Sequence, residues 1–344
     1  MRIPGRLLLA AARLRRYQLQ RRSHDPRPIQ EALLLRNIRC AERTDFGREH
    51  GFERIRTLSD YRARVPVRRY DDFKPWIERA IEGERDVLWP GRTEYFGMSG
   101  GTTAGNKYLP ISREAIRQQQ RNGFDPLAAY LDYSGDTGLL AGQAIMMGGS
   151  SALEIRPSGA RVGDNTGIMA NHMPLITRSF YRPGPRVRRI ADWEEKIQAL
   201  VEECLDDDVR LIAGTPSWFP GLFDRLLQEA RQRGKRASTV LQIWPNLRLL
   251  TGGGVNYEPY RPLIEARVGR KVAYVDVYNA TEGGIMGVQD DPEDRAMQLL
   301  PDAGVFYEFI PLEEIDREAP MRLALWDVKP GRVYALLVSN PSGL

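Results

Sequence analysis

Residues 96–110, FGMSGGTTAGNKYLP, gather glycines, hydroxyl groups and one lysine between two apolar runs. Glycines let backbone N–H groups turn toward an anion, and the hydroxyls and the ammonium group add donors and positive charge. Three interpretations compete: the loop holds the phosphates of a nucleotide, it holds another anion, or it is a surface hairpin that holds nothing. The density of donors favours an anion site built from Ser99, Gly100, Gly101, Thr102, Thr103, Gly105 and Lys107.

The segment does not match the P-loop pattern. That motif needs a glycine, four residues, and then Gly-Lys followed by a hydroxyl residue that reaches magnesium. Gly100 and Gly105 have the right separation, but Asn106 stands before Lys107, and Tyr108 follows it. The loop therefore contains the residue types that hold an anion, but their spacing is not that of a Walker motif.

A second glycine-rich turn, TGGGV, occupies residues 251–255 after an apolar run. Three successive glycines permit a flat ligand to approach the backbone closely. A plain turn at the end of a strand explains the same residues equally well. The candidate ligand contacts are Gly252, Gly253 and Gly254.

A third turn, VYNATEGG, occupies residues 277–284 and places an acid beside a threonine at the end of an apolar run. Glu282 offers the hard carboxylate oxygen that magnesium prefers, and Tyr278 is suited to cover a base ring. The alternative for Glu282 is an acid at the start of a helix, where it would complement the helix dipole. Thr281 lies next to this acid and completes the group of candidate residues.

The elements that must position these turns alternate along the chain. Residues 28–88 predict helices, residues 112–131 predict one helix capped by Ser112, and from residue 139 onward apolar strands alternate with amphipathic helices. This alternation predicts an α/β fold with a parallel sheet, whose ligands bind at the carboxyl ends of the strands. We expect the turns at 99–107, 251–256 and 278–284 at that edge. Residues 156–186 are expected to form a long surface excursion.

Composition places the chain among soluble globular proteins. The chain of 344 residues is too long for one ordinary hydrophobic core. Of its residues, 42% are hydrophobic and 28% are charged. No apolar run is long enough to span a bilayer, so no integral membrane association is expected. Two cysteines indicate a reducing compartment, the cytoplasm. The net charge of +5 is spread along the chain and not interleaved with aromatic residues, which argues against nucleic-acid binding.

The first 24 residues hold seven arginines and no acid, and residues 5–22 predict a basic amphipathic helix. One interpretation is a helix that lies on a membrane surface or directs targeting. The favoured interpretation is a solvated helix that packs on the body of the protein through Leu7, Leu8, Leu14 and Leu19.

In combination, the three turns resemble the adenylate-forming enzymes, whose first signature runs [Ser/Thr]-[Ser/Gly]-Gly-[Ser/Thr]-Thr-Gly-x-Pro-Lys. Residues 99–103 and Lys107 fall in register with it, while Ala104 replaces a glycine and Asn106 replaces the proline. Further segments, among them TDFGREHGF, VPVRRYDDFKPWIERAIEGE, AGTPSWFPGLFDRLL, LLTGGGVNYEPY and YNATEGG, are similar to the GH3 family of acyl-acid amido synthetases. The resemblance covers most of residues 28–344.

The resemblance implies a domain organisation. Residues 1–27 are expected to form a basic helical arm, and residues 28–344 the large, parallel-sheet-based N-terminal domain of an adenylate-forming enzyme. The final segment, GRVYALLVSNPSGL, resembles the family's Tyr-Glu-Leu-Val-Val-Thr-Asn segment, and the sequence stops within the motif that follows it. A ribose-binding aspartate, a hinge and a mobile C-terminal domain with a catalytic lysine would come next. The 344 residues are therefore expected to be an incomplete enzyme that is inactive alone.

The resemblance also implies an activity, the AMP-forming ligation of an acid to an amine. A carboxylic acid attacks the α-phosphate of ATP, and an amine, typically an amino acid, then displaces AMP from the acyl-adenylate. The loop at 99–105 would cradle the phosphates, with Lys107 on the β- and γ-phosphates. Thr281 would bond the α-phosphate and Glu282 would hold Mg²⁺. The turn at 252–254 and Tyr278 would sandwich the adenine.

Two other readings of the function stay open. One is an adenylating ligase that forms a thioester with coenzyme A or a carrier protein. The other is a non-catalytic protein that retains only nucleotide binding.

Overall fold

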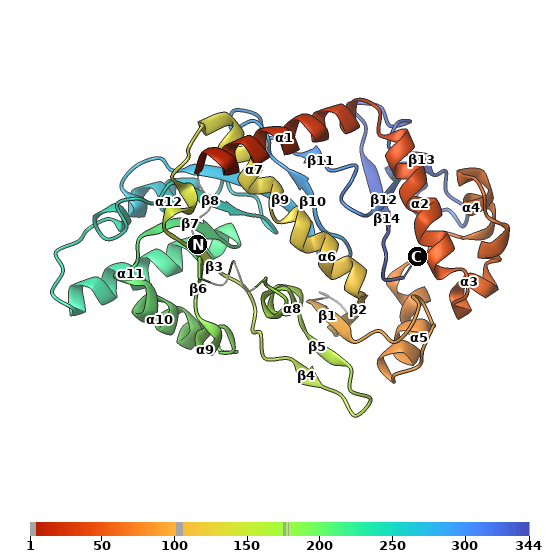
Figure 1. The fold of residues 1–344 in the computed structure, drawn as a ribbon, viewed down its shortest axis with the longest axis horizontal. Coiled ribbons are helices and arrows are strands. Elements are labelled where there is room, and N and C mark those ends of the chain that lie inside the picture. Colours follow the sequence, from red (N-terminus) through yellow and green to blue (C-terminus); the bar gives the residue numbers. More distant parts are fainter. Residues whose placement is uncertain (1–4, 101–105, 175–176, 178, 344) are drawn as a thin grey trace.

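A computed structural model describes residues 5–100, 106–174, 177 and 179–343. Within these residues the strands form three sheets of seven, four and three strands, with helices packed around them (Figure 1). The α/β fold predicted from the alternation of strands and helices is therefore confirmed.

The seven-stranded sheet has the strand order β11-β10-β9-β8-β7-β3-β6. Strands β6, β3, β7, β8 and β9 are parallel, and β10 and β11 add an antiparallel edge. The predicted parallel sheet is thus present, with an antiparallel extension that begins at the turn after β9. The strands are β3 Gln143–Met146, β6 Tyr181–Arg182, β7 Val209–Ala213, β8 Leu249–Gly252, β9 Ala273–Ala280, β10 Gly284–Val288 and β11 Gln298–Leu299.

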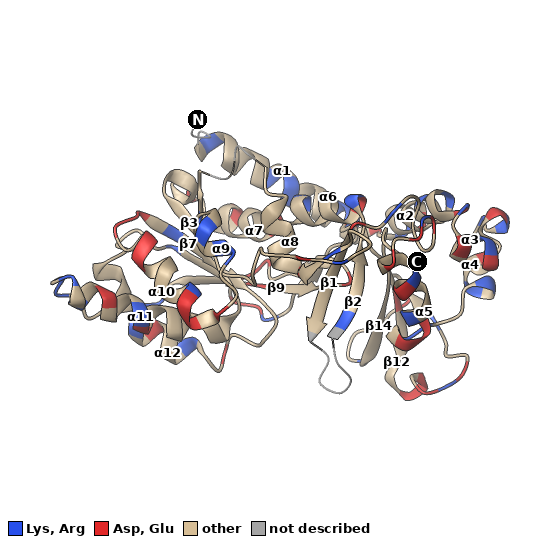
Figure 2. Ribbon diagram, turned by 90° about the horizontal axis from the view of Figure 1, so that it is seen from below, with Lys and Arg blue, Asp and Glu red and all other residues tan. Residues whose placement is uncertain are grey.

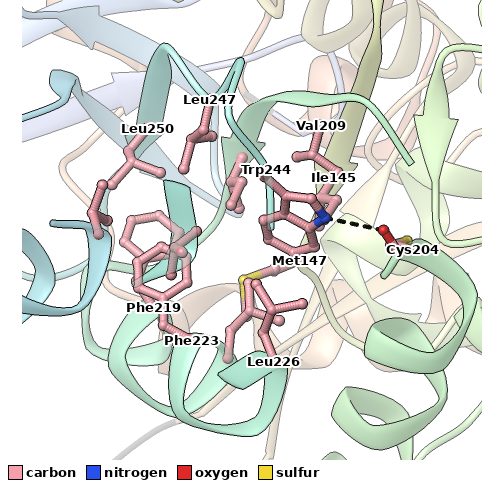
Figure 3. Packing of buried hydrophobic residues seen from close by; sticks show 14 of the residues in the cluster. Ile145, Met147, Cys204, Val209, Phe219, Phe223, Leu226, Trp244, Leu247 and Leu250 are labelled. Atoms are coloured by element: carbon pink, nitrogen blue, oxygen red, sulfur yellow. Dashed lines mark hydrogen bonds between the residues drawn. The ribbon is translucent and has the colours of Figure 1, made fainter. Parts of the chain in front are cut away.

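Helices cover both faces of this sheet, because alternate strand residues point to opposite sides. Leu250 packs with one core and its neighbour Leu249 with the other. The first core is closed by α9 Pro185–Arg188, α10 Trp193–Cys204, α11 Phe219–Gln232 and α12 Arg261–Val268. In that core Trp244 is fully buried and its indole Nε1 donates to the Cys204 carbonyl oxygen over 3.1 Å (Figure 3).

The opposite face of the sheet is covered by two helices, α1 Gly5–His24 and α7 Asp125–Ser134. Leu8 and Leu19 of α1 are buried as predicted, whereas Leu7 and Leu14 are 65% and 57% exposed. The prediction of a helix packed on the body is therefore correct for half of the named leucines. No helix of the described chain has the length and apolar character needed to cross a membrane.

The four-stranded sheet has the order β2-β1-β5-β4 and corrects two predictions. The described residues of the first motif, 99, 100, 106 and 107, belong to the antiparallel strands β1 and β2 of this sheet and not to the large parallel sheet. Residues 156–186 are not only a surface excursion, because β5 pairs with β1 and Val162 is buried. The elements are β1 Tyr95–Gly100, β2 Asn106–Ile111, β4 Glu154–Ile155, β5 Arg161–Asp164 and α8 Asn165–Asn171.

Residues 112–131 form two helices instead of the single helix predicted, α6 Arg113–Asn122 and α7. Pro126 explains the break, since proline is tolerated in the first turn of a helix but not in its interior. The predicted cap is present: the Ser112 hydroxyl oxygen accepts from the Ala115 N–H over 3.0 Å.

Residues 28–81 form helices separated by short breaks, as predicted, but residues 82–88 are not helical. Gly83 follows the last of these helices with a φ of +96°. These helices enclose a core with Phe96 of β1 and Phe306 of the three-stranded sheet, whose order is β13-β12-β14. Figure 1 shows the helices α2 to α5 gathered at the end of the molecule opposite α11 and α12. The elements are α2 Arg27–Ala41, α3 Asp45–Glu49, α4 Leu58–Arg64, α5 Tyr70–Ile81, β12 Phe306–Pro311, β13 Leu323–Ala324 and β14 Tyr334–Ser339.

Candidate active site

The β1–β2 hairpin carries the first candidate motif. Figure 2 shows the strands β1 and β2 of this hairpin side by side. Ser99 pairs with Lys107 and Gly100 with Asn106 at its described end. Four predicted phosphate-binding residues lie outside the described part of the chain: Gly101, Thr102, Thr103 and Gly105.

The hairpin meets the third motif at Gly97. A Cβ atom added at Gly97 would lie 2.7 Å from Cγ2 of Thr281, so only glycine lets these two segments approach so closely. Alternate residues of a strand share a face, as do residues directly opposite each other in an antiparallel pair. Ser99 and Lys107 therefore lie on the same face of the hairpin as Gly97, the face that contacts Thr281.

Lys107 is exposed, and its ammonium group lies 5.2 Å from the centre of the Tyr70 ring. The Tyr70 hydroxyl oxygen in turn accepts from the Tyr108 N–H over 2.8 Å. An ammonium group over an aromatic ring is held by a modest cation–π attraction at an exposed site. The Lys107 ammonium group is thus held beside the Tyr70 ring by a contact weak enough to be exchanged for a stronger anionic partner.

Thr281 and Glu282 form the tight turn between β9 and β10, and Gly283 N–H donates to the Ala280 carbonyl oxygen over 3.2 Å. Gly284 completes the turn with a φ of +71°, in the region that favours glycine. The alternative prediction for Glu282, an acid at the start of a helix, is therefore wrong. The Glu282 side chain is exposed and forms no ion pair with any described residue.

The Glu282 carboxylate acts electrostatically on the Tyr278 hydroxyl. Partial burial raises the pKa of the Tyr278 hydroxyl, and the negative charge of Glu282 raises it further. The aromatic residue and the carboxylate of the third motif thus interact electrostatically, one at the end of β9 and the other in the turn that follows it.

Glu282 fits one way of holding a metal ion and not another. The described residues contain no group of three or more His, Cys, Asp or Glu side chains able to bind a metal. Magnesium, however, usually binds proteins through one or two carboxylates together with substrate phosphates and water. A single exposed carboxylate suits an ion that arrives with a nucleotide, and not a site made by the protein alone.

The three positions of the second motif require glycine for different structural reasons. A Cβ atom at Gly252 would lie 1.6 Å from the Gly214 carbonyl oxygen, and one at Gly253 would lie 2.0 Å from the Val277 carbonyl oxygen. Glycine is required at both positions by the packing of neighbouring backbones. Gly254 has a φ of +89° and turns the chain toward a cavity.

That cavity has a volume of about 570 Å³, and both Gly254 and Tyr278 line it. Its wall includes Tyr274, whose ring stacks on the Tyr257 ring with centroids 3.7 Å apart. The structure thus brings the second and third motifs to one aromatic cavity beside β9, which is large enough for a heteroaromatic base and polar groups attached to it.

Asp276 also lines the cavity, and the sequence analysis did not single it out. Burial raises the pKa of its carboxyl group to about 6, although the Val277 N–H and the Tyr274 hydroxyl donate to it. The alternation in β9 contains a signal for this residue, because residues 274, 276 and 278 share one face of the strand.

Asn340 is a second residue that the sequence analysis missed. It follows β14 and lines a narrow crevice together with Thr281, Glu282 and Gln119 of α6. Its side-chain amide donates to the Glu282 carbonyl oxygen. No local pattern predicts this contact, since the two residues are 58 positions apart.

Comparisons with known proteins identify the family to which the chain belongs. A model described as the GH3 family N-terminal domain matches residues 15–188, and a model of the GH3 family central domain matches residues 298–344. The 4-substituted benzoates-glutamate ligase GH3.12 of Arabidopsis thaliana is 23% identical over 400 aligned positions, which cover 95% of this chain and 66% of that protein. The jasmonoyl-L-amino acid synthetase JAR4 of Nicotiana attenuata is 29% identical over 133 residues, 36% of this chain and 22% of that protein. The chain thus spans less than two thirds of the length of either relative.

Solved structures share the fold. The AtGH3.15 acyl acid amido synthetase in complex with 2,4-DB superposes with a TM-score of 0.76 at 16% identity, over 95% of this chain and 65% of that one. A 2-hydroxyisobutyryl-CoA ligase superposes with a TM-score of 0.59 at 17% identity, over 93% of this chain and 60% of that one. The N-terminal family model alone covers half of the sequence, and so the chain belongs to the GH3 family.

Proposed function

We propose that this protein catalyses the ATP-dependent adenylation of a carboxylic acid and the transfer of the acyl group to an amine, most simply an amino acid. The observation that carries the proposal is the contact at Gly97, which joins the donor-rich hairpin to Thr281 and Glu282 beside an aromatic cavity. Two relatives in the family are named for joining an acid to an amino acid, which supports the same reaction class here.

The chemical difficulty of the first step is charge, because a carboxylate must approach a polyphosphate and more negative charge develops as pyrophosphate leaves. Donors that are fixed in place before the reaction lower such a barrier. We assign this role to the hairpin, with Lys107 neutralising the outer phosphates and the Thr281 hydroxyl donating to the α-phosphate. The remaining donors are the backbone N–H groups and hydroxyls of Ser99, Gly100, Gly101, Thr102, Thr103 and Gly105.

Glu282 is the proposed magnesium ligand. The ion would neutralise phosphate charge and orient the nucleotide. Lys107 and Glu282 then have complementary tasks: the ammonium group attracts the phosphates directly, while the carboxylate holds the cation that accompanies them.

The aromatic cavity is the proposed site of the adenine. The turn formed by Gly252, Gly253 and Gly254 would lie on one side of the base and Tyr278 on the other. Gly252 and Gly253 act through the backbone packing that places Gly254, and Asp276 supplies a polar group in the wall.

We place the reaction in the cytoplasm. Cys40 and Cys204, the two cysteines of the chain, are both free thiols, as expected in a reducing compartment.

Carboxylate-dependent exchange of labelled pyrophosphate into ATP tests the first step. The assay uses the full-length protein and a pool of aromatic, indolic and fatty acids. Exchange that requires both an acid and magnesium supports adenylation, and dividing the pool identifies the acid. Absence of exchange with every acid, from a folded protein that still binds ATP, favours the non-catalytic alternative.

A second arm of the experiment identifies the acceptor. The fold shared with a 2-hydroxyisobutyryl-CoA ligase keeps thioester formation as the second candidate function. Amino acids and coenzyme A are supplied separately after the acid is known, and AMP release is measured. AMP release with an amino acid and not with coenzyme A supports amide formation, and the reverse result supports the ligase that forms a thioester.

A further inference from the structure

We propose that Asn340 is a positioning residue that holds the turn carrying Thr281 and Glu282. The inference rests on the proposed function only where it concerns catalysis, since the contact itself is structural. Asn340 lies on the segment after β14 and reaches a turn that belongs to a different sheet.

Both ends of the Asn340 amide are used. The Nδ2 atom donates to the Glu282 carbonyl oxygen, and the Oδ1 atom accepts from the Ser342 N–H over 2.8 Å. The second bond fixes the amide plane, which directs the Nδ2 donor at the turn. A hydroxyl or a methyl group at this position would not bridge the two partners.

The segment that carries Asn340 is anchored on both sides. Before it, the Ser339 hydroxyl lies 2.8 Å from the Tyr61 hydroxyl in a buried contact with α4. After it, the Ser112 N–H donates to the Ser342 hydroxyl oxygen over 2.9 Å, and the Ser112 hydroxyl donates to the Pro341 carbonyl oxygen. Asn340 therefore projects from a base that is tied to α4 and to the start of α6.

The turn is closed by the hydrogen bond from the Gly283 N–H to the Ala280 carbonyl oxygen, and its two glycines add no side-chain contacts to it. Gly283 and Gly284 follow Glu282 and carry no side chains, and glycine gives a backbone more freedom than other residues do. A hydrogen bond to the Glu282 carbonyl oxygen restricts the peptide plane next to Glu282. It thereby restricts the directions available to the Thr281 hydroxyl and the Glu282 carboxylate.

The test compares Asn340→Asp, Asn340→Ala and Tyr61→Phe in the full-length protein. Asp has the shape of Asn and can still accept from Ser342, but it places a carboxylate oxygen instead of a donor against the Glu282 carbonyl oxygen. Ala removes both bonds. Tyr61→Phe is the matched control, because it breaks an anchor of the same segment while the two Ser112 contacts and the Asn340 amide remain.

Two measurements are made on each variant. The first is the magnesium concentration that gives half-maximal pyrophosphate exchange. The second is the rate of amide hydrogen exchange of residues 278–284 in the free protein. Losing one net hydrogen bond corresponds to about a tenfold change in an equilibrium. We expect both quantities to rise about tenfold in Asn340→Asp and at least as much in Asn340→Ala, and to stay at wild-type values in Tyr61→Phe.

The outcomes separate this inference from the proposed function. Wild-type protein without pyrophosphate exchange would refute adenylation, while faster amide exchange at 278–284 in Asn340→Asp would still establish the positioning role. The inference is overturned if Asn340→Asp protects residues 278–284 as well as the wild type does. It is also overturned if Tyr61→Phe loosens them equally, because the contact with Glu282 would then have no role of its own.

Discussion

At the scale of single residues, the candidate site depends on a few side chains with contrasting environments. Glu282 is exposed and unpaired among the described residues, while Asp276 is partly buried and holds its proton more tightly than a free aspartic acid. Asp276 lies on β9 and Glu282 in the turn that follows it, but the two carboxylates are suited to different tasks. An exposed carboxylate binds a hydrated cation at little desolvation cost, whereas a shielded one is suited to a polar contact inside a cavity.

Glu282→Gln tests the magnesium assignment. The amide has the size of the carboxylate but lacks its charge, so acid-dependent pyrophosphate exchange should fall by about a hundredfold or more. Thermal unfolding should be unchanged, because the side chain makes no ion pair with described residues. Near-normal exchange by the variant at the same magnesium concentration would remove Glu282 from the metal site.

Asp276→Asn tests whether burial raises the pKa of the Asp276 carboxyl group. The test compares the stability of the variant and the wild type at several pH values. Because burial raises the pKa of Asp276 in the folded protein to about 6, from 3.8, the folded state binds the proton more tightly than the unfolded state does. The stability that protonation contributes is present below pH 4 and is lost as pH rises through 6.

The Asn variant should therefore be more stable than the wild type at pH 7, by about 1 kcal/mol after allowing for solvent screening. The difference should disappear near pH 4. Urea unfolding of both proteins between pH 4 and 7.5 measures it, and a constant difference over that range would contradict the assignment to Asp276.

At the scale of elements, the candidate site is a junction of segments from three sheets. The hairpin of the four-stranded sheet touches the β9–β10 turn of the seven-stranded sheet, and the segment after β14 closes the junction from the three-stranded sheet. None of these elements contains the site alone. Small changes in their relative placement should therefore alter activity without unfolding any one of them.

Gly97→Ala and Thr281→Ser probe this junction as a pair. The methyl group that Gly97→Ala adds would lie 2.7 Å from Cγ2 of Thr281, too close for an ordinary contact, so the single variant should lose activity about tenfold or more. Serine at position 281 removes the threonine methyl group and keeps the hydroxyl.

We expect Gly97→Ala to be far less harmful when combined with Thr281→Ser than in the wild-type background. A double-mutant cycle on pyrophosphate exchange measures this coupling. Additive losses would show that the hairpin and the turn do not meet as described.

At the scale of the whole molecule, α1 joins parts of the chain that are far apart in sequence. Arg15 Nε lies 2.5 Å from a carboxylate oxygen of Asp125 in α7, and Arg15 Nη1 lies 2.5 Å from Asp302, which follows β11. Figure 1 shows α1 lying along α7 at one side of the molecule. The basic N-terminal helix thus contributes charge to the interior contacts of the protein and not only to its surface.

Arg15→Ala should lower the free energy of unfolding by about 3 kcal/mol, because it leaves two nearly buried carboxylates without this partner. Arg13→Ala is the matched control on the same helix. Its ion pair with Asp132 is 4.0 Å long and its side chain is 61% exposed, so it should cost less than about 1 kcal/mol. Urea unfolding compares the two, and equal losses would contradict the specific role of Arg15.

The sequence alone was sufficient for the fold class and for the order of the three motifs. Strand and helix periodicity is local, and hence the parallel strands β7, β8 and β9 and the helices that follow β7 and β8 could be predicted from short segments. Pro126 shows the limit of this approach, because the pattern on both sides of it is helical and only the position of the proline divides the helix in two. The short strand β5 was missed because four residues carry too little periodicity to recognise.

The tertiary structure decided how the motifs meet. Nothing in the local sequence places Gly97 against Thr281 or Asn340 against Glu282, because these contacts join residues from three sheets. The tertiary structure also assigns different roles to the three glycines of the second motif: two allow neighbouring backbones to pack closely, and one faces the cavity. The physical reason is that the types of residues set what a loop is able to bind, whereas burial, close approach and hydrogen-bond partners depend on segments distant in sequence.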